Sequence, residues 1–532
     1  MNPPCLLFED DHLLVVNKPA GLNTHSPGPF AGEGLYDWLR HREPRWAGLA
    51  IIHRLDKETS GVLVFSKTPQ ANRSLTEQFT ERLVKKKYLL LTDHAAPSTK
   101  IVVRSSLVRS GDRYLSRPPK TGGQLAETVF SPAPPGVPAS RHAICVQAEP
   151  LTGRTHQIRV HAAEKSFPVL GDVRYGGTPW PRICLHAAEI SFVHPSTGQP
   201  LVFRAEPDFD SDIGLALRSA LIDETDTNAY RLIHGASDGC PGWYVDRLGS
   251  FILSQSSAEL TPERHARLRR LADHFSARGV YHKTLAVGPL RHDKQASSPR
   301  LVLGSSAPAR FDILENGVRF QLSFEEGYSV GIFLDQRGNR MRLSKGHVSA
   351  GFDELFDPAR PTRVLNAFAY TCAFSVCAAR SACHATSLDL SKKYLQWGKD
   401  NFKENHLDAS LHDFIFGDVF DWLRRFQKKG RKFDLILLDP PTFSHSKEFG
   451  AFRVDKDFGK LAQAALPLLE SGGVLFASCN AALWPAQDFV ATLRTACGKR
   501  KVLREHYAPQ PPDFPISRDE PAYFKSYWAR LV

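Results

Sequence analysis

The sequence predicts an α/β chain of several domains. Its 532 residues are too many for one hydrophobic core, since a domain holds roughly 100–200 residues, so we expect about three domains. Short aliphatic and β-branched runs alternate with apolar stripes of helical period, as they do in sheets covered by helices. A hydrophobic content of 42% with 23% charged residues is typical of a globular chain and shows no sign of disorder.

The chain is strongly basic. Its formal net charge is +12 and its isoelectric point is near 9.2. Lysine and arginine gather in clusters along the whole length, at residues 85–87, 267–270, 428–432 and 499–501. One such cluster alone is most often a solvated face. Their spread along the chain favours a polyanionic partner, RNA or DNA, over a small acidic metabolite.

Several classes of protein are excluded. Nine cysteines, an odd number with no Cys-x-x-Cys pair, indicate neither a disulfide scaffold nor a zinc site. Residues 1–11 carry acids and no basic n-region, so they do not resemble a signal peptide. No apolar run reaches the roughly 18 residues that a membrane-spanning helix needs. We therefore expect a cytoplasmic protein with no membrane partner and no bound metal.

The first elements are short strands. The apolar runs 6–8 and 13–16 flank an acidic turn, which predicts strand, turn, strand. The runs 49–52 and 62–65 form a second such pair, joined by the loop 53–61. That loop presents one carboxylate, Asp56, from the edge of a sheet. An isolated Asp in a loop is most often a turn former that bonds its own backbone.

A helix and a basic strand follow. One apolar residue recurs every four positions, which predicts one face of a helix, at Ala71, Leu75, Phe79 and Leu83. Residues 85–91 begin with three lysines and continue with Tyr88 and three leucines, which predicts a strand. Residues 153–161 then hold two arginines and two histidines, ahead of a glycine-rich loop at 171–177.

Five motifs in this first part identify a family. In order they are DDHLLVVNKPAG (10–21), HRLDKETSG (53–61), Lys86-x-Tyr88, GRTHQIRVH (153–161) and PVLGDVRYGG (168–177). Together they resemble the RluA-type pseudouridine synthases, which act on uridines of large-subunit rRNA and tRNA. Several motifs in family order are far more specific than any single pattern. The resemblance covers residues 1–207 and implies an α+β fold with a mixed or antiparallel sheet.

The resemblance implies roles for the residues at the centre of these motifs. Asp56 would be the catalytic carboxylate, either adding to the ribose anomeric carbon or assisting glycosidic cleavage, and the sequence leaves both routes open. Arg159 would hold Asp56 charged and oriented through a bidentate contact. Tyr88 would stack on the flipped uracil, near the proton that leaves carbon 5. Without the loop 53–61, Tyr88 would be interpreted as a core aromatic and Arg159 as a surface charge.

The same resemblance implies RNA contacts. Arg54 would fill the gap left in the base stack when the uridine swings out, because a planar cation can replace a base there. Arg154 and His156 would contact the substrate. No cofactor is expected for this half of the chain, since rearranging a glycosidic bond transfers no electrons or groups between molecules.

The middle of the chain divides into a linker and a small domain. Residues 208–227 are acid-rich and predict a linker that can hold a short helix. Residues 228–309 begin with a strand and a turn rich in glycine and proline, and they predict a small α/β domain.

From residue 310 to residue 532 the pattern is that of a doubly wound sheet. Short strands are predicted at 363–366, 385–389, 414–416, 433–438 and 473–477. Acids close three of them, at Asp389, Asp418 and Asp439. An acid closing the second strand, about 20 residues past the first loop, is placed to grip a ribose diol. Pro440 and Pro441 stiffen the turn after Asp439 and supply no backbone N–H.

This second part resembles the class I S-adenosylmethionine methyltransferases with a Rossmann-like fold, and more closely the 23S rRNA methyltransferases RlmI and the RlmK half of RlmKL. The matching text is RLIHGASDGCPGWYVDR, GIFLDQRGNR, VLNAFAYT, SLDLSKKYLQW and FDLILLDPPTFSHSKEF. In the relatives a glycine follows the Tyr-Thr pair, whereas this chain has Cys372. The resemblance implies S-adenosylmethionine as the cofactor and 23S rRNA as the partner, with tRNA as a second possibility. The oligomeric state is left open.

Site residues follow from this resemblance. Those implied for the cofactor are Asp335, Gln336, Arg337, Asn366, Phe368, Asp389 and Asp418. Those implied for the target base are Asp439, Pro440, Pro441 and Phe443. Asp389 would bind the ribose hydroxyls, Asp418 the adenine amine, and Phe443 would be available to stack on a base.

The methylated atom is open between two alternatives. RlmI-like enzymes methylate carbon 5 of cytosine, which needs a thiolate to attack the ring, and Cys479 lies where that group has a cysteine. RlmK-like enzymes methylate nitrogen 7 of guanine, which is nucleophilic by itself. Cys479 can equally be a small buried residue at the end of a strand.

The leading hypothesis is a bifunctional RNA-modifying enzyme that isomerises a uridine and methylates a base. The alternative is an active pseudouridine synthase whose methyltransferase-fold domain serves only as an RNA-binding scaffold.

Overall fold

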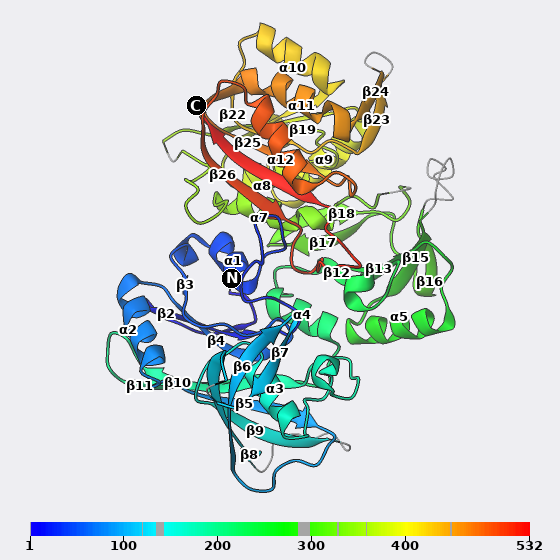
Figure 1. Ribbon diagram of the computed structural model, residues 1–532. Coiled ribbons are helices and arrows are strands. Elements are labelled where there is room, and N and C mark those ends of the chain that lie inside the picture. Colours follow the sequence, from blue (N-terminus) through cyan, green and yellow to red (C-terminus); the bar gives the residue numbers. More distant parts are fainter. Residues whose placement is uncertain are drawn as a thin grey trace. The chain divides into compact units, whose positions relative to one another are not determined.

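The computed structural model describes residues 2–119, 121–134, 143–285, 298–326, 329–357, 359–446 and 450–532 (Figure 1). The end of the last methyltransferase motif, residues 447–449, lies outside the described part. The chain forms two compact units. The first comprises Met1–His25, Gly34–Asp37 and Gly48–Asp223, and the second comprises Ser26–Glu33, Trp38–Ala47 and Glu224–Val532. The short helix α1 (Leu35–Arg42) contributes to both.

A mixed sheet of eleven strands organises the first unit. Its main order is β1-β2-β4-β10-β5-β9-β8-β6-β7, while β11 pairs with β10 and β3 with β4. Strands β4 and β10 pair in parallel, whereas β2 with β4, β10 with β5 and β5 with β9 pair antiparallel. The strands are β1 (Leu6–Glu9), β2 (Leu13–Lys18), β3 (Ala50–Ile51), β4 (Ser60–Ser66), β5 (Lys85–Thr92), β6 (Ile101–Ser110), β7 (Arg113–Arg117), β8 (Gln124–Pro132), β9 (Ile144–Pro150), β10 (Leu185–Val193) and β11 (Pro200–Arg204). The predicted mixed sheet is confirmed.

In the described part of the first unit, three α-helices accompany this sheet besides α1: α2 (Pro69–Thr80), α3 (Gln157–Glu164) and α4 (Ile213–Leu221). The Thr68 hydroxyl accepts a hydrogen bond from the N–H of Ala71 and caps α2. The apolar stripe predicted this helix, but the helix ends before Leu83. Arg82 has a left-handed φ of 60°, and Leu83 is 56% exposed.

The second unit begins with a sheet of five strands and a hairpin. The sheet has the order β12-β13-β14-β15-β16, and only β14 and β15 pair in parallel among its described strands. Its elements are β12 (Ala229–His234), β13 (Trp243–Leu248), β14 (Phe251–Ser256), α5 (Pro262–His274), β15 (Gly279–Thr284) and β16 (Arg300–Gly304). The hairpin consists of β17 (Phe311–Glu315) and β18 (Val318–Leu322).

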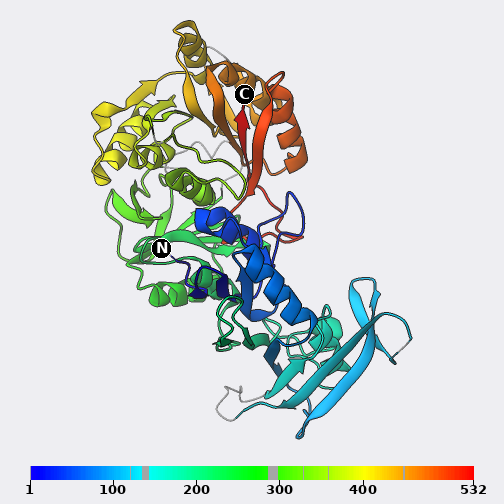
Figure 2. The ribbon, with the colours of Figure 1, turned by 90° about the vertical axis from the view of Figure 1, so that its left-hand side faces the viewer.

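A doubly wound sheet of seven strands forms the rest, and Figure 2 shows it edge-on with helices on both sides. The order is β21-β20-β19-β22-β25-β27-β26, parallel except for β27, which is antiparallel to both neighbours. The elements are α7 (Arg337–Lys345), β19 (Arg363–Ala367), α8 (Ala373–Arg380), β20 (His384–Asp389), α9 (Lys392–Glu404), β21 (Asp413–Phe416), α10 (Val419–Lys428), β22 (Phe433–Leu438), β23 (Phe443–Ser446), β24 (Gly450–Arg453), α11 (Val454–Ala465), β25 (Leu469–Cys479), α12 (Ala486–Ala496), β26 (Val502–Pro509) and β27 (Lys525–Leu531). The predicted Rossmann-like fold is confirmed.

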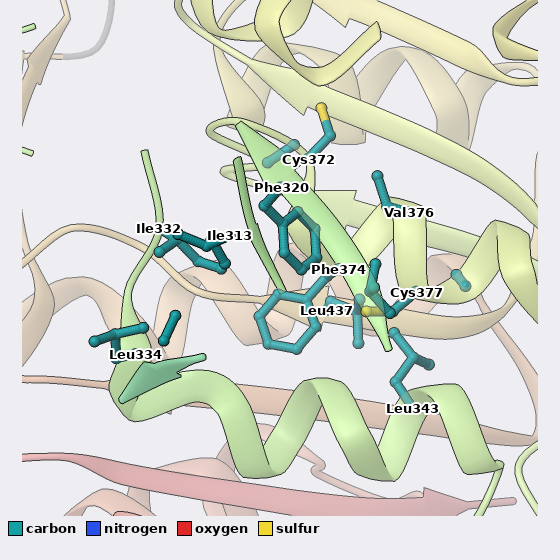
Figure 3. Close-up of a cluster of buried hydrophobic side chains, with 14 of the residues drawn as sticks. Ile313, Phe320, Ile332, Leu334, Leu343, Cys372, Phe374, Val376, Cys377 and Leu437 are labelled. Carbon is teal, nitrogen blue, oxygen red and sulfur yellow. The ribbon is translucent and has the colours of Figure 1, made fainter. Parts of the chain in front are cut away.

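Alternate residues of the central strands face opposite helical layers. Leu435 and Leu437 of β22 pack in one hydrophobic cluster with side chains from α7, α8 and α9. Ile436 and Leu438 pack in another with side chains from α10, α11 and α12. Figure 3 shows part of the first cluster, in which Phe374 of α8 lies near Leu437 and residues of the β17–β18 hairpin. None of the described helices combines the length and apolarity that a membrane span requires.

Candidate active sites

Asp56 lies in the loop between β3 and β4, and contacts on both sides fix its position. The Thr24 hydroxyl donates to the carbonyl of Leu55 at 2.8 Å and accepts from its N–H at 3.1 Å. The buried Lys18 ammonium donates to the carbonyl of Lys57 at 3.3 Å. Backbone anchoring on either side of one residue holds its side chain in a set direction.

Glycine is required where this loop meets the sheet. Gly61 has a φ of 120°, and a Cβ there would lie 2.3 Å from the carbonyl oxygen of Ala187 on the parallel neighbour β10. A side chain would push β4 away from β10 and carry the Asp56 loop with it.

Arg159 lies beside Asp56 but makes its bidentate contact elsewhere. Its Nε and Nη2 donate to the two carboxylate oxygens of Asp172 at 2.6 and 2.9 Å. Its Nη1 lies 3.7 Å from Oδ2 of Asp56. The expected bidentate contact with Asp56 is therefore wrong, because the planar fork of the guanidinium is already occupied. Burial acts to lower the pKa of Arg159, and Asp172 more than compensates, so the pKa is raised and the cation is held beside Asp56.

Tyr88 and Asp56 line one cavity of about 280 Å³, together with Arg159. Tyr88 projects from β5. Its burial, and secondarily the charge of Asp56, raise the pKa of the phenol, which therefore stays neutral. An aromatic face, a carboxylate and a cation in one cavity suit a flipped base and its ribose.

His156 is held on the other side of Asp56 by Tyr175. It precedes α3 with a left-handed φ of 56°, which directs its Nε2 to a point 4.0 Å from Oδ2 of Asp56. Its Nδ1 is 2.8 Å from the hydroxyl of Tyr175. Burial, and secondarily Arg159, lower the pKa of His156, which favours the neutral ring. Asp172 and Tyr175 were not predicted as site residues, although both belong to the motif at 168–177.

The cavity lining also includes the two remaining arginines of the predicted site. Nη2 of Arg54 donates to the hydroxyl of Thr155 at 2.8 Å, and Nε of Arg154 donates to the carbonyl of Leu125 at 3.3 Å. Both residues are exposed. The structure thus brings together all six residues predicted for this site, listed as Arg54, Asp56, Tyr88, Arg154, His156 and Arg159.

A second cavity of about 300 Å³ lies where the strands of the seven-stranded sheet end. The loop after β19 forms one wall, and three of its residues have left-handed backbone conformations, with φ of 62° at Phe368, 49° at Tyr370 and 60° at Cys372. Such conformations are costly for residues other than glycine and cluster at binding sites. Phe368 also lines an adjacent cavity of about 230 Å³.

Four predicted acids line these cavities, and the first two, Asp389 and Asp418, differ in the backbone groups they bind. Asp389 lines the larger cavity and accepts the N–H groups of Tyr370 and Ser391, each at 2.8 Å. Burial raises the pKa of Asp389 despite these bonds. Asp418 lines the smaller cavity, where its Oδ1 caps α10 by accepting the N–H of Phe420 at 2.9 Å.

The segment 335–337 contributes two of its three predicted residues. Asp335 and Gln336 line the larger cavity. Arg337 is instead paired with Asp513 through both guanidinium Nη atoms, and it is not among the described residues lining the cavity. Arg340, one turn further along α7, lines it instead and forms a buried pair with Glu315 at 2.6 and 2.7 Å.

Asp439 is a partly buried acid of this cavity with a raised pKa. Burial is the main cause that raises its pKa to about 6, and the charge of Asp335 acts in the same direction. The Ser478 hydroxyl donates to its Oδ1 at 2.6 Å, and Gln336 in turn donates to Ser478 at 2.9 Å. Pro440 and Pro441 line the same cavity.

Three further predicted residues, besides Arg337, lie away from the described lining. Asn366 is buried in β19 and donates to the hydroxyl of Ser375 at 2.9 Å. Phe443 is 60% exposed on β23. Cys479 is 1% exposed, belongs to the hydrophobic cluster on the side of α11 and α12, and has a pKa raised by burial. Its neighbour Ser478 faces Asp439, so strand alternation turns Cys479 to the opposite face.

The residues of the two adjoining cavities fit S-adenosylmethionine. Phe368, Leu390 and Val419 line both, so one continuous apolar surface joins them. Asp389 offers a carboxylate for a ribose diol. Asp335 and Asp439 offer oxygens near which a sulfonium cation is stabilised, since a cation offsets their cost of burial.

The chain matches two enzyme families, one in each half. Residues 12–164 match the family described as RNA pseudouridylate synthase, and residues 231–527 match the S-adenosylmethionine-dependent methyltransferase family. The chain therefore belongs to the S-adenosylmethionine-dependent methyltransferases and carries a fused pseudouridine synthase domain, and it is related to the RlmI-type rRNA methyltransferases.

Particular relatives support the second half. Ribosomal RNA large subunit methyltransferase I of Serratia proteamaculans is 34% identical over 314 residues, which cover 57% of this chain and 75% of the relative. Ribosomal RNA large subunit methyltransferase of Deinococcus radiodurans is 33% identical over 342 residues, or 60% of this chain and 78% of the relative. A crystal structure of SMU.776, a putative methyltransferase complexed with SAH, has a TM-score of 0.52 at 28% identity and covers 64% of this chain and 87% of its own.

Proposed function

We propose that this chain is a bifunctional RNA-modifying enzyme, which isomerises a uridine to pseudouridine and methylates a base, both in 23S rRNA. The observation that carries the proposal is one cavity with carboxylates in its lining in each family's part of the chain, one around Asp56 and Tyr88 and the other around Asp389 and Asp439. The substrate is proposed from the relatives named as large-subunit rRNA methyltransferases and from the net charge of +12. RNA of the tRNA class is the second candidate.

In the first site, Asp56 would act as the ionised carboxylate. The bond between the ribose anomeric carbon and uracil N1 breaks, the uracil turns, and a bond forms from that carbon to C5. The C5 proton is lost and N1 gains one, so the reaction is an isomerisation. Tyr88 would support the turning base, and Arg159, held by Asp172, would keep Asp56 charged and oriented. Arg54 would occupy the place of the flipped base in the stack.

In the second site, bound S-adenosylmethionine would supply an electrophilic methyl group. Asp389 would accept hydrogen bonds from the ribose hydroxyls, and Phe368 would contact the adenosine across the two cavities. Asp335 and Gln336, which line the same cavity, would close over the cofactor. Asp439 would accept a hydrogen bond from the target base, whose plane Pro440 and Pro441 would support.

We propose direct transfer to a nucleophilic ring nitrogen, of which guanine nitrogen 7 is the example, over transfer to cytosine carbon 5. The support is the position of Cys479, which is buried against α11 and α12 with a raised pKa. Methylation of a ring carbon needs a thiolate in contact with the base. The burial of Cys479 disfavours its thiolate, and its side chain points to the face of the sheet opposite Asp439. The Cys479→Ala variant is therefore expected to retain methylation. If the variant lost methylation, the result would favour cytosine carbon 5 as the methylated atom.

The test is to map pseudouridine and base methylation in rRNA from cells lacking this chain, and then to restore either the wild type or a variant. We expect one pseudouridine and one methylated base to disappear and to return with the wild type. Asp56→Asn should restore only methylation, and Asp389→Ala only pseudouridine. If every rRNA and tRNA modification survived the deletion, both proposed activities would be excluded.

Calorimetry separates the enzyme from the scaffold alternative. S-adenosylmethionine should bind the full chain, and Asp389→Ala should weaken that binding. Absence of binding to the wild type would favour a methyltransferase fold that serves only to bind RNA.

A further inference from the structure

Lys86 differs from the two lysines beside it. Lys85 is exposed, and Lys87 pairs with Glu189 at 2.8 Å. Lys86 is partly buried and lines the cavity of Asp56. No carboxylate among the described residues pairs with Lys86. Burial lowers the pKa of its ammonium, and no nearby charge opposes that shift.

The surroundings of Lys86 are apolar or neutral. Its Nζ lies 5.7 Å from the centre of the Phe79 ring, which stacks on His53 with ring centres 5.0 Å apart. The Nε2 of His53 accepts the N–H of Val64 at 3.2 Å. Burial, and secondarily Lys86, lower the pKa of His53 to about 3, so this ring is neutral at ordinary pH. A cation–π contact alone compensates a desolvated ammonium only in part.

The other cations of the cavity already have hydrogen-bond partners in the protein. Arg159 is bound to Asp172, Arg54 donates to Thr155, and Arg154 donates to the carbonyl of Leu125. The lining thus brings the four cations of Arg54, Lys86, Arg154 and Arg159 together with the single carboxylate of Asp56. Nζ of Lys86 lies near the backbone of Gly153, being 3.8 Å from where a Cβ would stand, so a ligand could approach it without meeting a side chain at residue 153.

We infer that Lys86 binds a phosphodiester group of the RNA, that of the flipped uridine or the one next to it. The inference rests on the proposed function, because an RNA nucleotide that enters this cavity brings its phosphate with it. A buried ammonium gains most from an anion, and the bond is charge-assisted. Lys86 is thus a positioning residue, which fixes the ribose against Asp56 without touching the reacting atoms.

The test compares Lys86→Met with Lys87→Met in the full chain. Lys86→Met should weaken RNA binding by roughly 10- to 100-fold, the range for a hydrogen bond to a charged group. It should also lower the slope of log affinity against log salt by about one, whereas Lys87→Met should change binding little. Lys86→Arg should restore most of the binding. Equal affinity and slope for Lys86→Met and the wild type would overturn the inference.

A modified RNA identifies the phosphate. Neutral methylphosphonate placed at the phosphates around the target uridine should weaken binding to the wild type at one position, and should cause no further loss in Lys86→Met. If each substitution weakened both proteins by the same factor, Lys86 would not be the group that binds phosphate. Unchanged binding of S-adenosylmethionine and an unchanged circular dichroism spectrum show that the Lys86→Met variant is folded.

These measurements separate the inference from the proposed function. The same binding comparisons are repeated with Asp56→Asn in every protein, the Asp56→Asn single variant taking the place of the wild type, so that binding does not depend on turnover. A wild type that forms no pseudouridine would exclude the proposed activity, whereas the inference for Lys86 is decided by the binding of the matched variants.

Discussion

At the scale of residues, the site around Asp56 depends on how one arginine divides its contacts. Arg159 is 3% exposed and gives its planar fork to the fully buried carboxylate of Asp172, leaving one nitrogen 3.7 Å from Asp56. The sequence predicts that an arginine stands beside Asp56. It cannot predict which of two carboxylates takes the bidentate geometry, because that depends on where the loop 168–177 folds back onto α3.

Asp56→Asn should abolish pseudouridine formation while RNA binding is retained. The change removes the ionised group but leaves the basic surface that supplies salt-dependent affinity. The measurement is pseudouridine yield and RNA affinity on the same preparation. Glu58→Gln is the matched control, because Glu58 is 3.9 Å from Arg159 and 46% exposed, and it should keep most of the activity. Appreciable yield from Asp56→Asn would exclude the assigned role.

Asp439 should set the pH dependence of methylation. Burial holds its pKa at about 6, and the ionised form accepts the stronger, charge-assisted hydrogen bond from the base. The methylation rate should therefore fall about tenfold per pH unit below about pH 6 and level off above it. Pseudouridine formation on the same preparation should lack this inflection. A flat methylation profile between about pH 5 and pH 8 would contradict the prediction.

The Asp439 carboxyl should also affect the stability of the fold, and here the protonated form is the favourable one. Because the pKa of folded Asp439 is above the usual 3.8, the folded protein binds more protons than the unfolded one between about pH 4 and pH 6. This residue's contribution to the free energy of unfolding is therefore lost as pH rises through that window. Asp439→Asn should raise the thermal midpoint relative to the wild type more at pH 7 than at pH 4.

At the scale of elements, the sequence predicts strand positions well and the direction of individual side chains less well. Apolar runs identified β19, β20 and β22, whose residues are buried on both faces. A strand buried on both faces has no polar–apolar alternation, so the side on which Cys479 points could not be predicted. The same limit applies to Asn366, which is buried in β19 and bonds Ser375.

Cys372, which stands where the relatives have glycine, lies at the start of α8 in close contact with α9. A Cβ on Gly398 of α9 would lie 2.3 Å from Sγ of Cys372, so Gly398→Ala should destabilise the second unit by about 1–3 kcal/mol through overpacking. Cys372→Gly should relieve that loss in the double variant, since glycine also suits the left-handed φ of 60°. The measurement is a double-mutant cycle in thermal unfolding. Purely additive effects would show that the contact carries no strain.

At the scale of the whole molecule, the two proposed reactions would use different residues and different chemistry. We expect Asp56→Asn to methylate at the wild-type rate and Asp389→Ala to form pseudouridine at the wild-type rate, both on the same RNA. Quantifying both products in one reaction checks this. A loss of methylation in Asp56→Asn would mean that the pseudouridine product is required by the second site.

The pairing of Cys372 with Gly398 also has a consequence for the history of the family. A methyltransferase with glycine at the position of Cys372 leaves room for the methyl group of an alanine at the position of Gly398. A chain with cysteine at the position of Cys372 must keep glycine at the position of Gly398. Substitutions at these two positions should therefore be correlated across relatives, with the larger residue moving from one helix to the other.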